Sequence, residues 1–334
     1  MLSFGVLGAG VMANTHIDGV LGNGADNVKY IGVYDEDLKK SGTLAEKFGM
    51  KTYCSFEEML ADDEIDGIDI CLPSFLHEEF AIRAAQAKKH ILVEKPIAFT
   101  PEAAERIFGV AHENGVRIMV AQVLRFWPEY ATIKDYIDRG ELGDIVTIYA
   151  ARLGQMPSWG GWYKDPDKAG GALENLILHD IDFLHYLLGK PKSVYSVGAK
   201  DEYDIYNDVL SVFKFENGAN VYVDGSLRMT VGYTFTMHMR VLGTKGTMEF
   251  LYKGGENVDT KNSLSELKIY HDGDGGKDVQ YTSYDAYGKE VSYFAACIES
   301  GKETETVTEE SVLTVLNSIV KANESLITGQ VYAL

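Results

Sequence analysis

The sequence has few cysteines, a deficit of basic residues and no long apolar run. Its three cysteines, Cys54, Cys71 and Cys297, lie far apart and are odd in number, which argues against a disulfide framework and against a spaced metal site. Lys and Arg total 31 against 50 Asp and Glu, and the formal net charge is −19. Nucleic acid and anionic membranes bind basic surfaces, so we expect neither as a partner.

No segment has the pattern of a membrane span or a secretory signal. Apolar runs stay well short of the ~20 residues that cross a bilayer, and Met1 leads within two residues into a strand-like run. These features predict a cytoplasmic protein. At 334 residues, with 46% hydrophobic and 24% charged side chains, the chain has the length and composition of two globular domains.

The first part of the chain alternates continuous apolar runs with helical segments. The apolar runs are FGVLG, VKYIGVY, GIDICLP, KHILVEK and RIMVAQ, and segments such as EEFAIRAAQAKK separate them. This alternation is typical of βαβ units, in which helices cover both faces of a parallel sheet. We therefore predict a doubly wound α/β domain with a parallel sheet over residues 1–121.

Residues 122–334 follow a different pattern, in which apolar and polar residues alternate along strand-like runs. In VLSVFKFENGANVYVDGSLRM the segment ENGAN separates two such runs and predicts a hairpin turn. Helical patterns accompany the strands near 129–139, 173–188, 286–299 and 308–327. We predict an α+β domain with a large, mostly antiparallel open sheet, and we find no internal repeat or low-complexity linker.

The segment GVLGAGVMANTH has the three small residues of a dinucleotide-binding fingerprint. Gly8 permits the tight turn, Gly10 lets the backbone approach a pyrophosphate, and Ala13 allows the helix to pack closely on the strand. A glycine-rich turn that binds nothing is the alternative. The fingerprint follows a predicted strand and opens a predicted helix, and this context favours binding.

The run YIGVYDED indicates which nicotinamide cofactor is bound. Asp35 stands at the end of the second strand, where a carboxylate accepts hydrogen bonds from the ribose hydroxyls and repels a 2′-phosphate. We therefore expect NAD rather than NADP. Lys39 and Lys40 lie close by in the sequence and oppose this preference, because a nearby cation tolerates the phosphate.

Lys95 is a candidate catalytic residue in the segment ILVEKPIAF. It follows an apolar strand, and ligands of open α/β sheets bind at the carboxyl ends of the strands. Pro96 restricts Lys95 to extended conformations and permits a cis peptide bond. The backbone therefore fixes the direction in which the ammonium group points. A solvated surface charge is the alternative interpretation.

The segment LENLILHDIDFL predicts a helix with polar side chains along one side. Asn175, His179, Asp182 and Tyr186 are spaced by four and three residues and therefore share a face. That face meets either water or a cavity that holds a polar molecule. A hydrogen-bonded core histidine is the alternative for His179.

These motifs resemble those of the glucose-fructose oxidoreductase / inositol dehydrogenase / MocA (Gfo/Idh/MocA) family over nearly the whole chain. The matching pieces are GAGVMA with a helix containing His16, PSFLH at 73–77, EKP at 94–96, RFWPEY at 125–130, GELGDI at 140–145, AGGALENLILHDIDFLHYLLG and KEVSYFAACIESGKE. The resemblance implies that residues 1–121 form a dinucleotide-binding Rossmann domain with a nicotinamide cofactor. It implies a homodimer or homotetramer formed through the second domain's sheet. It also implies small-molecule substrates that are sugars, inositols or related polyols.

The resemblance further implies roles for particular residues. Lys95 would hydrogen-bond the reacting oxygen, and His179 would be the general acid/base. Arg125 and Trp162 are candidates on the substrate side with Asn175 and His179. Besides the residues above, the cofactor would be lined by Val11, Met12, Leu72, Pro73, His77, Glu94, Lys95 and Gln122. None of the eight histidines falls into a recognisable ligand spacing, so no metal site is predicted.

The sequence departs from the family pattern at Asn175, where an aspartate is usual. Asparagine keeps the hydrogen bonding but lacks the charge that stabilises a protonated imidazole. Asp182, one turn further along, could supply that charge. Three functions stay open: an NAD-dependent sugar or polyol dehydrogenase or reductase, a glycosidase or lyase that oxidises its substrate transiently with tightly bound NAD, and a non-catalytic NAD and sugar sensor.

Overall fold

The computed structural model describes residues 1–334 except 24, 158–160, 256–262 and 274. The chain forms two compact units. The first contains Met1–Trp127 and Ser283–Leu313, and the second contains Pro128–Thr282 and Thr314–Leu334. This division differs from the predicted boundary after residue 121, because the chain returns to the first unit at Ser283.

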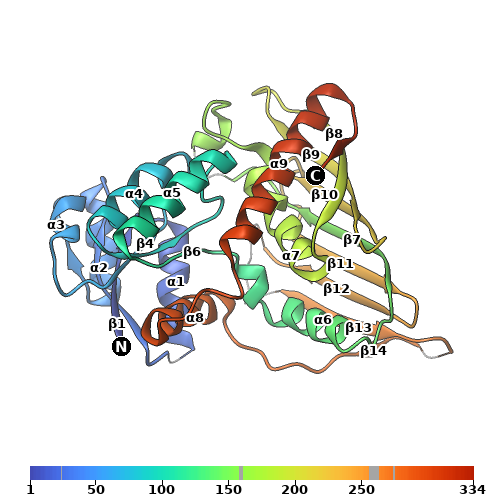
Figure 1. Ribbon diagram of the computed structural model, residues 1–334, viewed down its shortest axis with the longest axis horizontal. Coiled ribbons are helices and arrows are strands. Elements are labelled where there is room, and N and C mark those ends of the chain that lie inside the picture. Colours follow the sequence, from blue (N-terminus) through green and yellow to red (C-terminus); the bar gives the residue numbers. More distant parts are fainter. Residues whose placement is uncertain (24, 158–160, 256–262, 274) are drawn as a thin grey trace. The chain divides into compact units, whose positions relative to one another are not determined.

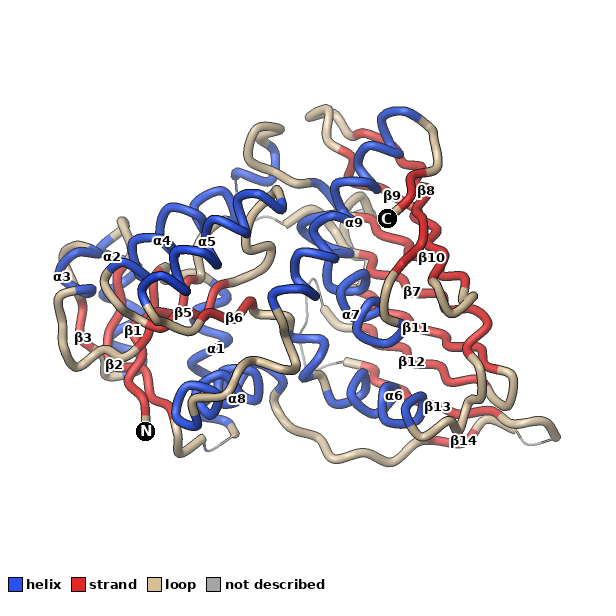
Figure 2. The backbone as a smooth tube through the Cα atoms, in the orientation of Figure 1, coloured by secondary structure: helices blue, strands red, loops and turns tan. Residues whose placement is uncertain are grey.

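The first unit is built on a six-stranded parallel sheet with the order β3-β2-β1-β4-β5-β6. Its strands are β1 (Leu2–Leu7), β2 (Val28–Tyr34), β3 (Lys51–Thr52), β4 (Gly67–Ile70), β5 (His90–Val93) and β6 (Ile118–Val120). Its helices are α1 (Val11–Gly22), α2 (Leu38–Phe48), α3 (Phe56–Leu60), α4 (His77–Gln86), α5 (Pro101–Asn114) and α8 (Ala286–Ser300), with the 3₁₀ turns η1 (Ser74–Leu76) and η2 (Val123–Phe126). Figure 2 shows α4 and α5 on one face of the sheet and α1 and α8 on the other. The predicted doubly wound fold is confirmed, and its strand order changes direction between β1 and β4.

Local sequence signals explain where helices of this unit begin and end. Thr100 caps α5 by accepting a hydrogen bond from the Ala103 N–H, and Pro101 occupies the first turn, where its missing N–H costs nothing. Gly115 ends the helix with φ of 68°, a left-handed conformation that glycine adopts without strain.

Helix α8 belongs to the first unit because it packs on α1 at very close range. A Cβ on Gly288 would lie 2.0 Å from the Gly19 carbonyl oxygen, so the two backbones touch. Asn23 Nδ2 donates to the Asp285 carbonyl at 2.7 Å, and the Asp285 N–H donates to Asn23 Oδ1 at 2.9 Å. These contacts explain why a segment late in the sequence completes the N-terminal unit.

The second unit contains a nine-stranded sheet with the order β14-β13-β12-β11-β7-β10-β9-β8-β15. Neighbouring strands are antiparallel except β7 and β10, so the predicted mostly antiparallel sheet is confirmed. The strands are β7 (Ile145–Leu153), β8 (Pro191–Lys200), β9 (Tyr206–Phe215), β10 (Asn220–Ser226), β11 (Thr236–Gly243), β12 (Thr247–Lys253), β13 (Leu264–Tyr270), β14 (Lys277–Asp278) and β15 (Tyr332–Ala333). The predicted hairpin at ENGAN joins β9 and β10, and Gly218 supplies its turn with φ of 92°.

Helices cover one face of this sheet, as Figure 1 shows for α6, α7 and the last part of α9. The helical segments are α6 (Pro128–Asp138), the 3₁₀ turn η3 (Gly161–Lys164), the π-helix η4 (Leu173–Ile177), α7 (Leu178–Leu188) and α9 (Glu309–Thr328), which the two units share. Buried residues alternate with partly or fully exposed ones along β9, so among the described residues the opposite face of the sheet is open. Among the described helices, none is long and apolar enough to cross a membrane.

Candidate active site

The glycine loop after β1 has the shape of a dinucleotide-binding loop. Gly8 has φ of 95°, and a Cβ there would lie 2.6 Å from the Cys71 carbonyl oxygen, so only glycine fits. A Cβ on Gly10 would meet none of the described atoms within 4 Å, so the packing of the chain leaves space there. No described side chain caps the N-terminus of α1 at Gly10, and its N–H groups suit an anion such as a pyrophosphate. Ala13, fully buried, packs in the core beneath the loop, while Val11 is exposed and Met12 is partly exposed at the start of the helix.

Asp35 is fixed beside this loop. Its Oδ2 accepts a hydrogen bond from the Ala9 N–H at 2.8 Å, and its Oδ1 accepts one from the Asp37 N–H at 2.8 Å. The carboxylate is partly exposed at the end of β2, where a ribose would meet it. An open pocket of about 260 Å³ adjoins Ala9, and Lys39, Lys40 and Lys47 line part of it. The same end of the sheet therefore carries an acid that disfavours a 2′-phosphate and lysines that favour one.

The loops after β4 and β5 are joined through His77. This fully buried imidazole places Nδ1 2.7 Å from the Pro96 carbonyl oxygen and Nε2 2.8 Å from the Leu72 carbonyl oxygen. Leu72 and Pro73, which follow β4, are both partly exposed. The ring contacts loop carbonyls, so its observed role is to hold the two loops together. Its contact with a cofactor stays a prediction.

Lys95 follows β5 at the carboxyl end of the parallel sheet, as predicted. It is partly exposed, and its peptide bond with Pro96 is cis. The preceding Glu94 is buried, and its Oε2 accepts a hydrogen bond from the Lys95 N–H at 3.0 Å. Strand β5 and this carboxylate together fix the backbone from which the lysine side chain extends.

Three other predicted site residues have clear surroundings. Gln122 is buried two residues after the end of β6. Arg125 is also buried, and its Nη1 donates to the Thr306 carbonyl at 2.6 Å and to Ser311 Oγ at 3.2 Å. These are contacts within the first unit, and the substrate role of Arg125 stays a prediction. Trp162 stacks on Tyr163 with ring centroids 4.0 Å apart and is partly exposed.

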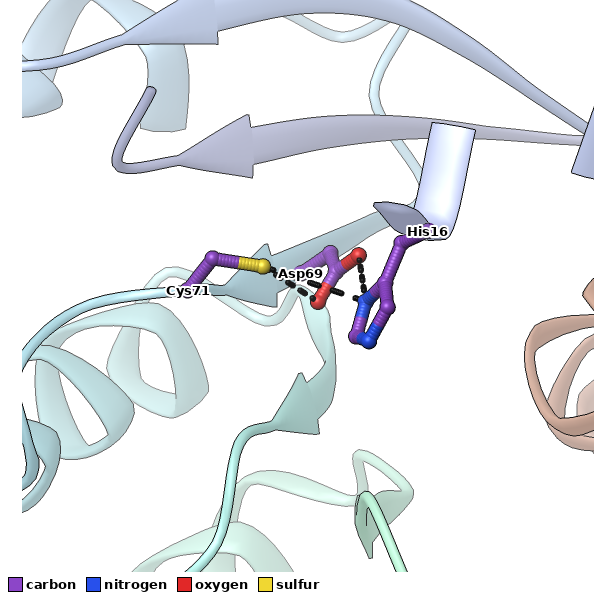
Figure 3. Close-up of side chains that lie close together, drawn as sticks. All are labelled: His16, Asp69 and Cys71. Atoms are coloured by element: carbon purple, nitrogen blue, oxygen red, sulfur yellow. Dashed lines mark hydrogen bonds and ion pairs between the residues drawn. The ribbon is translucent and has the colours of Figure 1, made fainter. Parts of the chain in front are cut away.

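No sequence motif predicted the cluster of His16, Asp69 and Cys71, in which the first two side chains are fully buried and Cys71 is partly exposed. His16 Nδ1 lies 2.9 Å from Asp69 Oδ2, and Cys71 Sγ donates to Asp69 Oδ1 at 3.5 Å (Figure 3). The potential metal-binding atoms of the three side chains lie within 4.8 Å of one another. Asp69 lies in β4 and Cys71 directly follows the strand. Nothing near them in the sequence indicates a contact with His16, which precedes Asp69 by 53 residues.

The predicted polar stripe lies on η4 and α7. Asn175, His179 and Tyr186 are partly exposed, whereas most of their helical neighbours are buried. Asp182 is fully buried, so it departs from the expected stripe. Gly170 and Gly171 bring the start of this helix close to its neighbours, because a Cβ on Gly171 would lie 2.7 Å from the Tyr206 carbonyl oxygen.

A buried ion pair fixes α7 to the sheet one residue after His179. Arg152 Nε donates to Asp180 Oδ2 at 2.7 Å, and its Nη2 donates to Asp180 Oδ1 at 3.2 Å. The two side chains are 5% and 0% exposed. Arg152 Nη1 also contacts Met237 Sδ at 2.8 Å. This two-pronged contact sets the rotation of α7 and with it the direction of its partly exposed face.

Glu174 lies in η4 next to Asn175 and is buried. Its Oε1 accepts a hydrogen bond from Asn323 Nδ2 of α9. Burial raises the pKa of Glu174 to about 8, because the ionised form loses its hydration and this hydrogen bond compensates only in part. The carboxyl group therefore carries a proton at neutral pH.

We expect Glu174→Gln to stabilise the second unit increasingly as the pH rises. Between about pH 4.5 and pH 8 the unfolded chain has lost this proton while the folded chain keeps it, so the free energy of unfolding of the wild type falls by about 1.4 kcal/mol per pH unit. Glutamine has no proton to lose. Denaturant unfolding of both proteins across this pH range measures the difference. The exposed Glu216→Gln is the control, and parallel curves for wild type and Glu174→Gln would contradict the expectation.

Comparisons with known proteins agree with this geometry. Two family models match, an oxidoreductase family with an NAD-binding Rossmann fold over residues 2–122 and a GFO/IDH/MocA C-terminal domain over residues 130–249. D-xylose 1-dehydrogenase (NADP(+)) 2 of Haloferax volcanii is 29% identical over 98% of both chains. Inositol 2-dehydrogenase of Rhizobium meliloti is 28% identical over 90% of this chain and 89% of its own.

A solved structure shares the fold. Levoglucosan dehydrogenase in complex with NADH and L-sorbose matches with a TM-score of 0.85 at 22% identity, covering 99% of this chain and 98% of that chain. The glycine loop, the strand order and the family models that match both units all indicate the same family. This chain belongs to the Gfo/Idh/MocA family of oxidoreductases with an NAD(P)-binding Rossmann domain, as its motifs predicted.

Proposed function

We propose that this protein is an NAD-dependent oxidoreductase that interconverts a hydroxyl and a keto group on a sugar, an inositol or a related polyol. The observation that supports it most is the arrangement at one end of the parallel sheet. There the chain leaves space at Gly10 after β1 and presents Lys95 after β5. Ligands of open α/β sheets bind at this end, near the change in strand direction. Relatives named D-xylose and inositol dehydrogenase support this substrate class.

Lys95, His179 and Asn175 would each have a separate role at the reacting part of the substrate. Bound NAD would supply a hydride acceptor. The Lys95 ammonium would donate a hydrogen bond to the oxygen and stabilise the negative charge that develops on it. His179 would take the hydroxyl proton during oxidation and return it during reduction. Asn175, four residues earlier, would hydrogen-bond a substrate oxygen in place of the aspartate that is usual there.

Spectrophotometry of the reduced nicotinamide band tests this function. The purified protein is mixed with NAD or NADP and, one at a time, with inositols, aldoses and glycosides. A rise in absorbance with one of these substrates is the expected result. If the protein binds NAD but no substrate produces a rise, net hydride transfer is contradicted, and the glycosidase or lyase and the sensor become the better explanations.

Asp35 should determine the choice of NAD. We expect Asp35→Ala and Asp35→Asn to shift the ratio of kcat/KM for NADP over NAD upward by about tenfold or more, because both remove the charge that repels a 2′-phosphate. Asparagine keeps an oxygen that can accept the Ala9 N–H, so it separates the charge from the support of the loop. An unchanged ratio in both variants would mean that Lys39, Lys40 or another group reads the ribose.

We also propose that the open face of the nine-stranded sheet joins copies of this chain into a homodimer or homotetramer. Exposed apolar side chains lie there on β8, β9, β10 and β11, where a monomer would leave them in water. They are Tyr195, Val197, Leu210, Tyr222 and Leu242. Light scattering should give a mass of two or four chains. A mass of one chain at micromolar concentration would contradict the proposal.

A further inference from the structure

A histidine lies between two carboxylates behind the glycine loop. His16 Nδ1 is 2.9 Å from Asp69 Oδ2, and His16 Nε2 is 3.2 Å from Glu94 Oε1. Asp69 is the third residue of β4, and Glu94 directly follows the neighbouring strand β5. His16 and Asp69 are fully buried and Glu94 is 7% exposed, so water does not separate these charges.

His16, Asp69 and Glu94 form an ion network, and two further side chains donate hydrogen bonds to its Asp69 carboxylate. Tyr30 donates its hydroxyl to Asp69 Oδ2 at 2.5 Å, and the Cys71 thiol donates to Asp69 Oδ1 at 3.5 Å. The Tyr287 ring of α8 lies 5.9 Å from the imidazole, centroid to centroid. The titratable groups that face the network from the packed elements are therefore Tyr30 of β2, Asp69 and Cys71 from β4, Glu94 after β5, and Tyr287 and Glu290 of α8.

This arrangement favours a protonated His16. An imidazolium carries a proton on each nitrogen. Nδ1 can donate its proton to Asp69 Oδ2, and Nε2 lies 3.2 Å from Glu94 Oε1, a charge contact without hydrogen-bond geometry. A neutral ring would turn a lone pair toward one of the two carboxylates. Burial opposes the charge, but the attraction and the hydrogen bond of Asp69, together with the neighbouring Cys71, outweigh it and raise the pKa of His16 well above its ordinary value.

A metal ion is the other way to explain the cluster of His16, Asp69 and Cys71. A metal would need the cysteine as a thiolate. Burial raises the pKa of the Cys71 thiol, which keeps its proton and donates it to Asp69. Tyr30 already donates to the other oxygen of Asp69. The described contacts therefore favour a hydrogen-bonded ion network.

We propose that His16 is a positioning residue for Lys95. Its imidazolium holds the Glu94 carboxylate through Oε1, and Oε2 of the same carboxylate accepts the Lys95 N–H at 3.0 Å. Helix α1 thus carries the glycine loop at its N-terminus and fixes the lysine backbone from its second turn. The catalytic part of this inference rests on the proposed function, in which the Lys95 side chain contacts the reacting oxygen.

Two amide variants separate the contacts of His16. In His16→Gln the amide nitrogen can take the place of Nε2 toward Glu94, and in His16→Asn it can take the place of Nδ1 toward Asp69. We expect His16→Asn to lower kcat by about 10- to 100-fold with unchanged NAD affinity, because a small displacement of a catalytic group costs about that much. His16→Gln should recover most of this loss. Tyr30→Phe, which removes a donor to Asp69 only, is the control for general disturbance of the network.

Equal kcat values for His16→Asn and the wild type, both folded by thermal unfolding, would overturn the positioning role. Equal losses in the Asn and Gln variants would also overturn it, because a role through Glu94 requires the Gln variant to recover. If the wild type itself transfers no hydride, the proposed function fails, and the ion network is judged by a measurement that needs no activity.

That measurement is the ¹⁵N chemical shift of the imidazole nitrogens in protein labelled at histidine. Wild-type His16, assigned by loss of its signals in His16→Gln, should keep imidazolium shifts through the pH range, around 6.5, in which an ordinary histidine loses its proton. Neutral-ring shifts within this range would overturn the ion network. Stoichiometric zinc in the purified protein, lost in His16→Gln, would overturn it in favour of a metal site.

Discussion

Lys95→Met is expected to lower kcat by about 10³-fold while NAD still binds. Methionine keeps the length of the side chain but removes its ammonium group. The negative charge on the reacting oxygen then lacks its donor, and loss of a single such donor costs about 10²- to 10³-fold in rate. The glycine loop, Asp35 and the hydrogen bond between Glu94 and the Lys95 N–H do not depend on that side chain, so cofactor affinity should be kept.

Single-turnover kinetics and NAD titration separate the two effects. Lys302→Met is the matched control, since it removes one exposed positive charge from the same unit. Lys95→Arg tests whether charge alone suffices, because its wider guanidinium keeps the charge but changes the geometry. Wild-type turnover in Lys95→Met would refute the catalytic assignment, and a loss of NAD binding would move Lys95 from catalysis to cofactor binding.

The sequence predicted those features that repeat along the chain. Alternating apolar runs and helices predicted the parallel sheet, and Gly8 marked the tight turn after β1 because the left-handed backbone there admits only glycine. The strand end that carries Lys95 followed from the same pattern. Each of these features depends on residues close together in the sequence.

Contacts between distant segments were not predictable in this way. His16 pairs with Asp69 across 53 residues, and Arg152 pairs with Asp180 across 28. The return of α8 to the first unit depends on Gly19 and Gly288, whose small size permits a close approach. Single small or polar residues of this kind do not recur at a regular spacing, so the sequence pattern does not indicate which distant residue each of them contacts.

The helix stripe shows how a local pattern can be right in part. Asn175, His179 and Tyr186 share a partly exposed side, but Asp182 is buried. The π-helix at residues 173–177 changes only the position of Asn175 relative to the others. Asp182 lies between His179 and Tyr186 in the regular helix α7, so tertiary packing rather than helical spacing buries it. Sequence spacing alone could not reveal that burial.

Asp180→Ala is expected to lower the free energy of unfolding by about 3–5 kcal/mol. The change removes the Asp180 carboxylate from the Arg152 guanidinium, which is buried at 5% exposure, and breaking one side of a buried pair typically costs this much. Replacing both partners by apolar side chains, as in Arg152→Met with Asp180→Leu, should restore much of the stability, because the buried charge is then gone. Urea unfolding followed by circular dichroism measures each variant.

The ion pair of Lys134 and Asp138 on α6 provides the control. It lies on the surface of the same unit with a distance of 2.7 Å, and Asp138→Ala should cost at most about 1 kcal/mol because water already screens the pair. If Asp138→Ala and Asp180→Ala lower the free energy of unfolding by similar amounts, the expectation that burial makes the loss of an ion pair more costly is refuted. Because Asp180 follows His179 directly, the apolar double variant also separates stability from catalysis. If the ion pair sets the direction of His179, that variant should fold well and still turn over slowly.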